Sequence, residues 1–174
     1  PKIKFWLGFI QLLKKIFFRL VARTMSEKNF WNLVRNNLDL KMYRVENRVA
    51  VGMPDVHYIS EKSSGWIELK FIPILPKKGK IKTGVRKAQS MWHDTYCKHG
   101  GNSWLLFRID RRGIVLIDGS VCKSISKGKT VCDLITMCSW SKMGNMSDND
   151  WDELRSVIDG RKVEENYDSI GIGK

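Results

Sequence analysis

Apolar residues recur along the chain with two periods, one typical of helices and one typical of strands. From Ser26 to Leu38 they fall at steps of three and four, which predicts a helix with one buried stripe and Ser26 as its N-cap. Shorter runs rich in β-branched and aromatic residues, bounded by Gly, Pro and turn residues, predict strands. The pattern predicts helices over 26–38, 85–98, 130–139 and 149–158, and strands over 42–50, 55–60, 65–71, 103–109 and 114–118.

This order of elements predicts an α/β domain with a central mixed sheet flanked by helices. A chain of 174 residues suits one domain, and 43% apolar residues are too many for a disordered chain. Trp66 and Trp104 fall in predicted strands and are expected in the core. Four cysteines without CxxC spacing indicate reduced thiols and a cytoplasmic location.

The two ends of the chain differ from its middle. Residues 1–24 are basic and amphipathic, and Lys14 and Lys15 interrupt the apolar run, so no transmembrane segment is predicted. Met25 begins a stretch that looks like a natural protein start, so residues 1–24 are either an appended, non-native leader or a basic helix for a membrane surface or DNA. Residues 161–174 are expected to form a flexible tail.

Charge narrows the class of partner. The net charge is +13; residues 1–24 hold six cations and no acid, residues 147–174 hold eight acids and four cations, and residues 25–146 therefore carry +11. Such a domain favours a polyanionic partner, above all nucleic acid. Candidate phosphate contacts cluster in one basic stretch, whose alternative is a plain solvated loop. They are Lys77, Lys78, Lys80, Lys82, Arg86 and Lys87.

Three charged residues in two adjacent predicted strands could carry chemistry. Glu68 and Lys70 are two apart and share one strand face, while Asp55 begins the preceding strand of the same hairpin. Two close carboxylates need a proton or a cation between them, and Mg²⁺ suits two carboxylates together with a substrate phosphate. The alternative is a solvated hairpin face with weak surface ion pairs.

The residues Gly52-x-Pro-Asp55 and Glu68-x-Lys70 resemble the PD-(D/E)XK nuclease superfamily. With residues 44–47 before the first motif, Gln89 in the next helix and Gly100-Gly101 before a buried strand, the chain is similar to small phage VRR-NUC and Holliday-junction-resolvase-like nucleases. The resemblance implies a restriction-endonuclease-like core over 25–118, with a helical addition over 119–160.

The same resemblance implies roles for individual residues. Asp55, Glu68 and the backbone carbonyl of Leu69 would hold Mg²⁺ or Mn²⁺, Lys70 would be catalytic, and Gln89 with Lys87 would face DNA. Such nucleases often add an acid, for which Glu27 is slightly favoured over Glu46.

Two further motifs fail on spacing. Residues 126–130 end like a phosphate-binding loop but lack its first Gly, and His93, Cys97 and His99 do not match the ligand spacing of a common zinc site. Taken as a whole, the sequence predicts a Mg²⁺-dependent endonuclease acting on DNA, with branched DNA as the expected substrate and a homodimer as one option. The alternative is a non-catalytic DNA-binding module that keeps the fold.

Overall fold

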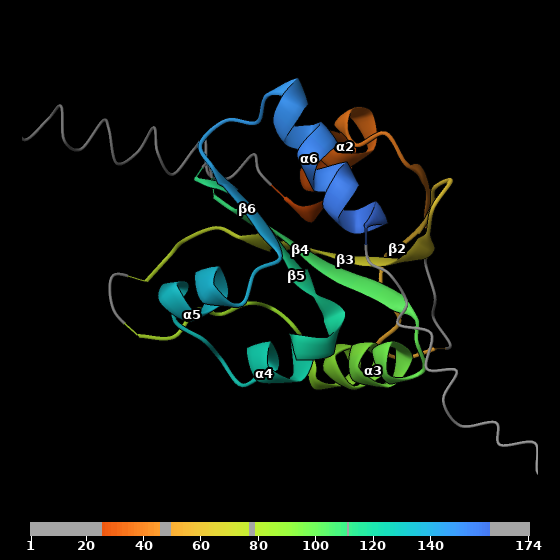
Figure 1. The fold of residues 1–174 in the computed structure, drawn as a ribbon. Coiled ribbons are helices and arrows are strands. Elements are labelled where there is room, and N and C mark those ends of the chain that lie inside the picture. The colour runs from red at the N-terminus through yellow and green to blue at the C-terminus, as the bar shows by residue number, and fades with distance from the viewer. Residues whose placement is uncertain (1–25, 46–49, 77–78, 111, 161–174) are drawn as a thin grey trace, which may run out of the picture.

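The computed structural model describes residues 26–45, 50–76, 79–110 and 112–160. Their helices and strands alternate along the chain, and one sheet joins all six strands in sequence order (Figure 1). The elements are α2 (Glu27–Asn37), β1 (Lys41–Arg44), β2 (Val56–Ile59), β3 (Ser64–Ile72), α3 (Lys87–Lys98), β4 (Asn102–Ile109), β5 (Gly113–Asp118), a 3₁₀ turn (Gly119–Val121), α4 (Cys122–Ser126), α5 (Val131–Thr136), β6 (Trp140–Met143) and α6 (Asp148–Asp159).

The sheet is mixed and is covered on both faces. β3 and β4 are parallel, and the other neighbouring pairs are antiparallel. Figure 1 shows α2 and α6 on one face of the sheet, and α3 and α4 on the other. The expected α/β fold, a central mixed sheet flanked by helices with further helices after it, is confirmed.

Several predicted boundaries were wrong. The strand expected over 42–50 ends at Arg44, and the helix expected over 130–139 ends at Thr136. Strand β6 was not predicted, because its four residues alternate between half-buried and exposed positions at the sheet edge and give little apolar signal. The division at residue 118 stays a prediction, and residues 1–24 and 161–174 lie outside the described part of the chain.

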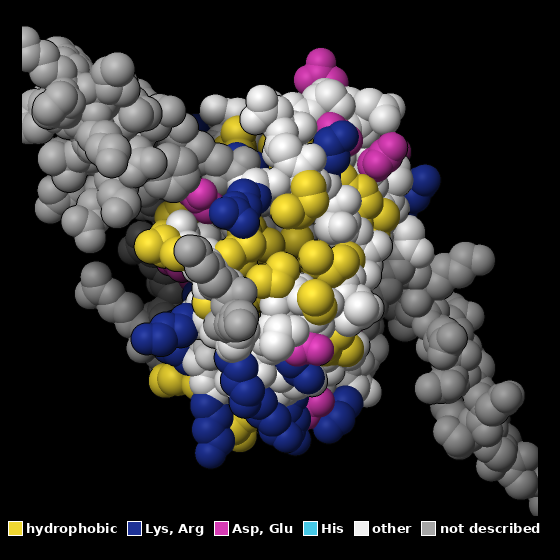
Figure 2. Space-filling view, turned by 90° about the vertical axis from the view of Figure 1, so that its left-hand side faces the viewer, with side chains coloured by type: hydrophobic (Ala, Val, Ile, Leu, Met, Phe, Trp, Pro, Cys, Tyr) yellow, Lys and Arg dark blue, Asp and Glu magenta, His cyan; other side chains and the backbone are white. Residues whose placement is uncertain are grey.

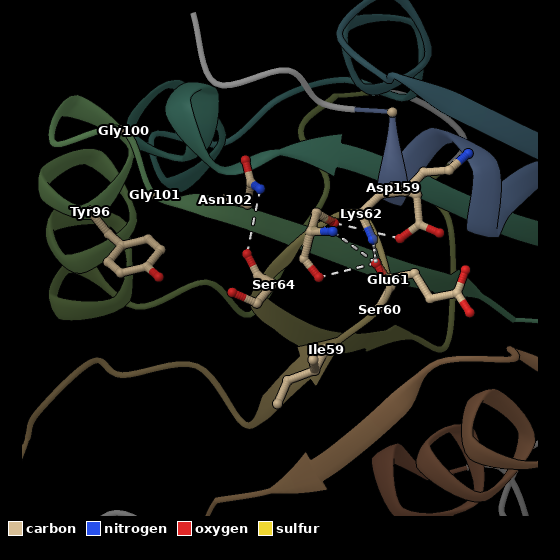
Figure 3. Close-up of a pocket in the computed structure, with 12 residues that line it drawn as sticks. Ile59, Ser60, Glu61, Lys62, Ser64, Tyr96, Gly100, Gly101, Asn102 and Asp159 are labelled. Carbon is tan, nitrogen blue, oxygen red and sulfur yellow. Dashed lines mark hydrogen bonds between the residues drawn. The ribbon is translucent and has the colours of Figure 1, made fainter. Parts of the chain in front are cut away.

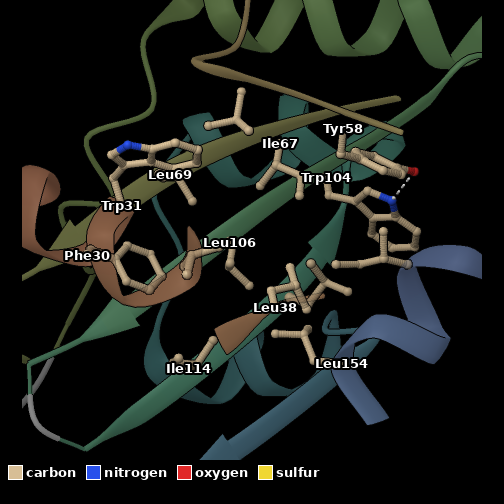
Figure 4. Packing of buried hydrophobic residues seen from close by; sticks show 14 of the residues in the cluster. Phe30, Trp31, Leu38, Tyr58, Ile67, Leu69, Trp104, Leu106, Ile114 and Leu154 are labelled. Atoms are coloured by element: carbon tan, nitrogen blue, oxygen red, sulfur yellow. Dashed lines mark hydrogen bonds between the residues drawn. The ribbon is translucent and has the colours of Figure 1, made fainter. Parts of the chain in front are cut away.

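Two hydrophobic cores sandwich the sheet. The first packs the stripe of α2 and residues of α6 against one sheet face, and Figure 4 shows Phe30, Leu69, Leu106 and Leu154 within it. The second includes residues of β4, β5, α4 and α5. Because side chains alternate along a strand, Leu69 enters the first core while its neighbours Glu68 and Lys70 point to the opposite face.

The two tryptophans expected in the core differ. Trp104 is 3% exposed, and its indole N–H donates to the Tyr58 hydroxyl at 3.3 Å (Figure 4). Trp66 is only partly buried, so its expected core position was wrong. Its ring lies between the rings of His57, with centroids 4.9 Å apart, and Trp92, with centroids 5.8 Å apart.

Candidate active site

Asp55, Glu68 and Lys70 lie near the point where the pairing of β2 with β3 ends. Their antiparallel pairing ends at Val56 opposite Ile67, so the next pair in the same register would be Asp55 and Glu68. Asp55 instead pairs with the other side, where its carbonyl accepts from the Val45 N–H at 2.8 Å. From Glu68 onward, β3 is therefore no longer paired with β2, and Asp55 lies at the point where this pairing ends.

Glu68 and Lys70 form a buried ion pair. The Lys70 ammonium lies 2.6 Å from Glu68 Oε1, and the two residues are 8% and 0% exposed. The prediction that they share one strand face is confirmed. The solvated hairpin face is excluded, because charged residues this deeply buried are rare in proteins unless they are paired or functional.

Gln89 connects the first turn of α3 to this pair. Its side-chain N–H donates to Glu68 Oε1, while its amide oxygen accepts from the Arg86 backbone N–H at 3.0 Å. The amide is therefore held at both ends, with its oxygen satisfying an N–H at the helix start. Gln89 is 1% exposed and contacts the Glu68 carboxylate, and its expected role toward DNA stays a prediction.

The second oxygen of Glu68, Oε2, is buried and has no hydrogen-bond partner among the described residues. Burial raises the pKa of Glu68 to about 7; the Lys70 charge opposes this shift, and the charges of Asp55 and Glu27 add to it. An unpartnered buried carboxylate oxygen is costly in a folded protein, so its retention points to a ligand-binding role.

The first helix contributes one acid at the rim of the site. Glu27, in the first turn of α2, has its Oε1 3.9 Å from the Lys70 ammonium and a side chain that is half exposed. Its place beside the site supports its candidacy as the additional acid. Glu46, the other candidate, lies outside the described residues.

Gly52 explains how the loop before Asp55 reaches the helix. It has φ +92°, a backbone conformation that favours glycine, and a Cβ there would lie 2.9 Å from the Gln89 backbone nitrogen and closer still to the Ala88 carbonyl. The Gly-x-Pro-Asp motif therefore packs its backbone directly on the first turn of α3. This contact ties the position of Asp55 to that of Gln89.

The remaining predicted basic residues that the structure describes are exposed, before α3 or at its start. Arg86 and Lys87 begin α3 at exposed positions, and Lys80 and Lys82 are exposed in the preceding loop; Lys77 and Lys78 lie outside the described residues. The Leu69 side chain is in the first core, and the role of its carbonyl in binding a metal stays a prediction.

The site offers carboxylate oxygens as possible ligands for a divalent metal ion. Within the described ranges, no three His, Cys, Asp or Glu side chains are arranged as a ready metal site. Two neighbouring carboxylates, one with an unpartnered buried oxygen, nevertheless fit the oxygen ligands that Mg²⁺ prefers when waters and a phosphate complete its shell. Asp55 and Glu68 would hold it.

Sequence reasoning missed a buried contact behind the site. His93 is fully buried, its Nδ1 lies 2.9 Å from Ser103 Oγ, and burial together with Lys70 lowers its pKa to about 4. The spacing of Gln89 and His93, four residues apart on one helix, could have indicated that both face the sheet. Because His93 is neutral and fully buried at pH 7, we infer that it has a structural role in packing α3 against β4 behind the site.

A separate pocket lies at the Ser64 end of β3. It has a volume of about 860 Å³ and is lined by the β2–β3 turn, the end of α3 and the end of α6, including Tyr96, Asn102 and Asp159 (Figure 3). None of the predicted site residues lines it. The candidate active site therefore lies outside this pocket.

No family model and no curated protein matches the chain. A solved structure of Archaeoglobus fulgidus Hjc, a Holliday junction resolvase, is similar at 12% identity and a TM-score of 0.40, over 55% of this chain and 75% of that one. At this level of similarity the likeness carries no weight for function, which is argued below from the site. Within the described residues, no helix is long and apolar enough to cross a membrane.

Proposed function

We propose that this protein is a divalent-metal-dependent endonuclease that hydrolyses DNA phosphodiester bonds, with Asp55, Glu68 and Lys70 as its active-site residues. The observation that carries the proposal is the buried Glu68–Lys70 pair, in which one carboxylate oxygen has no partner, next to a second carboxylate. The surrounding +11 charge supports DNA as the substrate, because it attracts the phosphate backbone to these acids.

Each residue has a distinct task in this proposal. Asp55 and Glu68 would hold Mg²⁺ or Mn²⁺, and such an ion would lower the pKa of a bound water and offset charge on the phosphate oxygens. Lys70, held by Glu68 at 2.6 Å, positions the attacking water or stabilises the negative charge that develops on the phosphate. Gln89 fixes the Glu68 carboxylate through its contact with the start of α3.

Branched phage DNA, such as a Holliday junction, is the substrate that we propose within this class. A symmetric pair of chains would cut the two strands that such a junction requires, so we include a homodimer in the proposal. The four cysteines are free thiols, which suits the reducing cytoplasm of a host cell.

The test is cleavage of supercoiled plasmid and of a synthetic four-way junction by the purified full chain, with Mg²⁺, with Mn²⁺ and with EDTA. We expect cleavage with either metal and none with EDTA. Asp55→Asn and Glu68→Gln should each abolish it, because each removes a ligand charge.

The matched control is Glu61→Gln, which changes an exposed acid in the turn of the same hairpin. It should cleave like the wild type. Activity that persists in both Asp55→Asn and Glu68→Gln would refute the proposal. Metal-independent DNA binding without any cleavage would instead favour the alternative, a non-catalytic DNA-binding module.

A further inference from the structure

A second basic segment lies against the predicted phosphate-binding loop, although the two are far apart in sequence. The backbone N–H of Ile81 donates to the Lys129 carbonyl at 2.7 Å, and the two residues form an isolated antiparallel bridge. Lys129 belongs to residues 126–130, which fail as a nucleotide-binding loop on their spacing. In the fold, residues 126–130 therefore lie against the basic loop around Ile81, although their motif resembles a loop that binds a nucleotide phosphate.

The bridge is anchored in the core while its lysines stay outside. Ile81 is 3% exposed and packs in the second core, whereas Lys80 and Lys82, on either side of it, are exposed. Gly128, with φ +80°, turns the chain between Lys127 and Lys129. A Cβ on Gly128 would lie 3.2 Å from Lys80 Cδ, so the Lys80 side chain crosses directly over this turn.

Four lysines thus share one surface, which we name the paired basic surface: Lys80, Lys82, Lys127 and Lys129. None of them forms an ion pair with a described residue, and residues 79–87 and 120–130 contain no acid. Asp133 is close by, but its carboxylate accepts from the backbone N–H and hydroxyl of Thr130 at the start of α5. The hydrogen bonds from Thr130, and to a smaller extent the charge of Lys129, lower the pKa of Asp133. Four cations beside this one acid still repel one another, so folding alone gives no reason to gather them.

The paired basic surface leads to the candidate active site. Beyond Lys82 the chain passes Gly84, where a Cβ would lie 3.7 Å from Lys70 Cδ, and then enters α3 at the contact between Gln89 and Glu68. On the other segment, Ser126 at the end of α4 donates its hydroxyl to Ser90 of α3 at 3.3 Å. Figure 2 shows Lys and Arg side chains gathered at the lower end of the molecule, where α3 and α4 lie in Figure 1.

We propose that Lys127 and Lys129 bind DNA phosphates together with Lys80 and Lys82, as one surface that holds the backbone beside the cut. This inference rests on the proposed function for the identity of the polyanion. Phosphate contacts position a nucleic acid without reading its sequence, so the surface contributes affinity and register rather than base specificity.

The experiment measures binding of the full chain to a fluorescent four-way junction in EDTA, across salt concentrations from about 50 to 200 mM. Lys127→Gln with Lys129→Gln should weaken binding roughly tenfold and lower the slope of log K against log salt by about 1.8, since each phosphate contact contributes about 0.9. Lys127→Arg with Lys129→Arg should retain the wild-type slope.

The matched control is Lys41→Gln with Lys62→Gln, which removes the same charge from exposed positions. Lys41 begins β1, and Lys62 lies in the turn between β2 and β3. It should leave the slope unchanged. An equal loss of affinity and of salt slope in both double variants would overturn the proposal, because the total charge of the protein would then explain the effect. So would an unchanged slope in the Lys127 and Lys129 variant.

This outcome is separable from that of the proposed function. Cleavage by the wild type with an unchanged slope in the variant refutes only the paired basic surface. Loss of slope without any cleavage by the wild type refutes only the endonuclease. If the variant loses binding to anionic phospholipid vesicles but keeps full affinity for DNA, the surface serves a membrane and the inference is wrong.

Discussion

At the scale of single residues, Glu68 determines what the site can do. A fully buried carboxylate that keeps one oxygen unpartnered is expensive, and replacing a buried ion pair by apolar residues is often neutral or stabilising. The pair of Glu68 and Lys70 is therefore better explained by function than by stability. Two predictions at this scale concern Glu68 and the side chain that fixes it.

The first prediction concerns pH and the stability of the metal-free protein. The pKa of Glu68 rises from 4.5 to about 7 on folding, so the folded state binds a proton that the unfolded state releases between these values. The contribution of Glu68 to stability is therefore fully present below pH 4.5 and is lost as pH rises through 7. His93 acts in the opposite sense, because its lowered pKa adds stability as pH rises from about 4 to 6.5.

The difference between the wild type and Glu68→Gln isolates the Glu68 contribution from that of His93. Urea unfolding at a series of pH values should show this difference falling from pH 4.5 to 7, by on the order of 3 kcal/mol. Glu61→Gln, at an exposed position, should follow the wild type throughout. A difference that stays constant or grows with pH would contradict the assigned burial of Glu68.

The second prediction concerns Gln89→Met, which keeps the length of the side chain but removes both hydrogen bonds. The Arg86 N–H and Glu68 Oε1 each lose a partner, which should cost about 1–3 kcal/mol in the free energy of unfolding. Cleavage should slow as well, because Glu68 is no longer fixed. Thermal unfolding and cleavage rates test it, and a variant with unchanged values of both would contradict the role of Gln89.

At the scale of elements, the site depends on how the loop after β1 and the start of α3 pack together. The third prediction compares Gly52→Ala with Gly144→Ala. Both glycines have positive φ, at +92° and +96°, but a Cβ on Gly52 meets α3 whereas one on Gly144 has open space. Backbone strain alone should cost about 1–2 kcal/mol at Gly144, and the clash should raise the cost at Gly52 to about 2–5 kcal/mol.

Denaturant unfolding of both variants measures these costs, and a cleavage assay should show that only Gly52→Ala is impaired. The reason is that the clash displaces Asp55 from Glu68, while Gly144 lies away from the site. Equal stability losses in the two variants would show that the close approach to α3 is unimportant.

The hairpin and its paired charges could be predicted from sequence because strand alternation is local. That rule placed Glu68 and Lys70 on one face, and the turn residues of the hairpin brought Asp55, at the start of the preceding strand, near enough for its charge to raise the pKa of Glu68. The end of the β2–β3 pairing at Val56 could not be predicted from the sequence. The contact of Gln89 with Glu68 could not be predicted from spacing, since it depends on how α3 packs against β3. Strand β6 was missed because its stability comes from pairing with β5 rather than from its own residues.

At the scale of the whole molecule, each face of the sheet carries an apolar core, and the charged candidate site lies on only one of these faces. α2 and α6 cover the first face with a continuous core (Figures 1 and 4). Glu68 and Lys70 point to the other face, where Gln89 of α3 contacts Glu68. The net charge indicates a polyanionic partner, which stays a proposal. The bridge between Ile81 and Lys129 could not have been predicted, because it joins two segments through the tertiary fold.

The most direct test of the central claim is the single-turnover cleavage rate of a four-way junction by the wild type and by Glu68→Gln, each with Mg²⁺ and with EDTA. We expect metal-dependent cleavage by the wild type and no detectable cleavage by Glu68→Gln, which means a rate lower by a factor of roughly 100 or more. Equal rates in the two proteins, or cleavage that survives EDTA, would contradict the central claim.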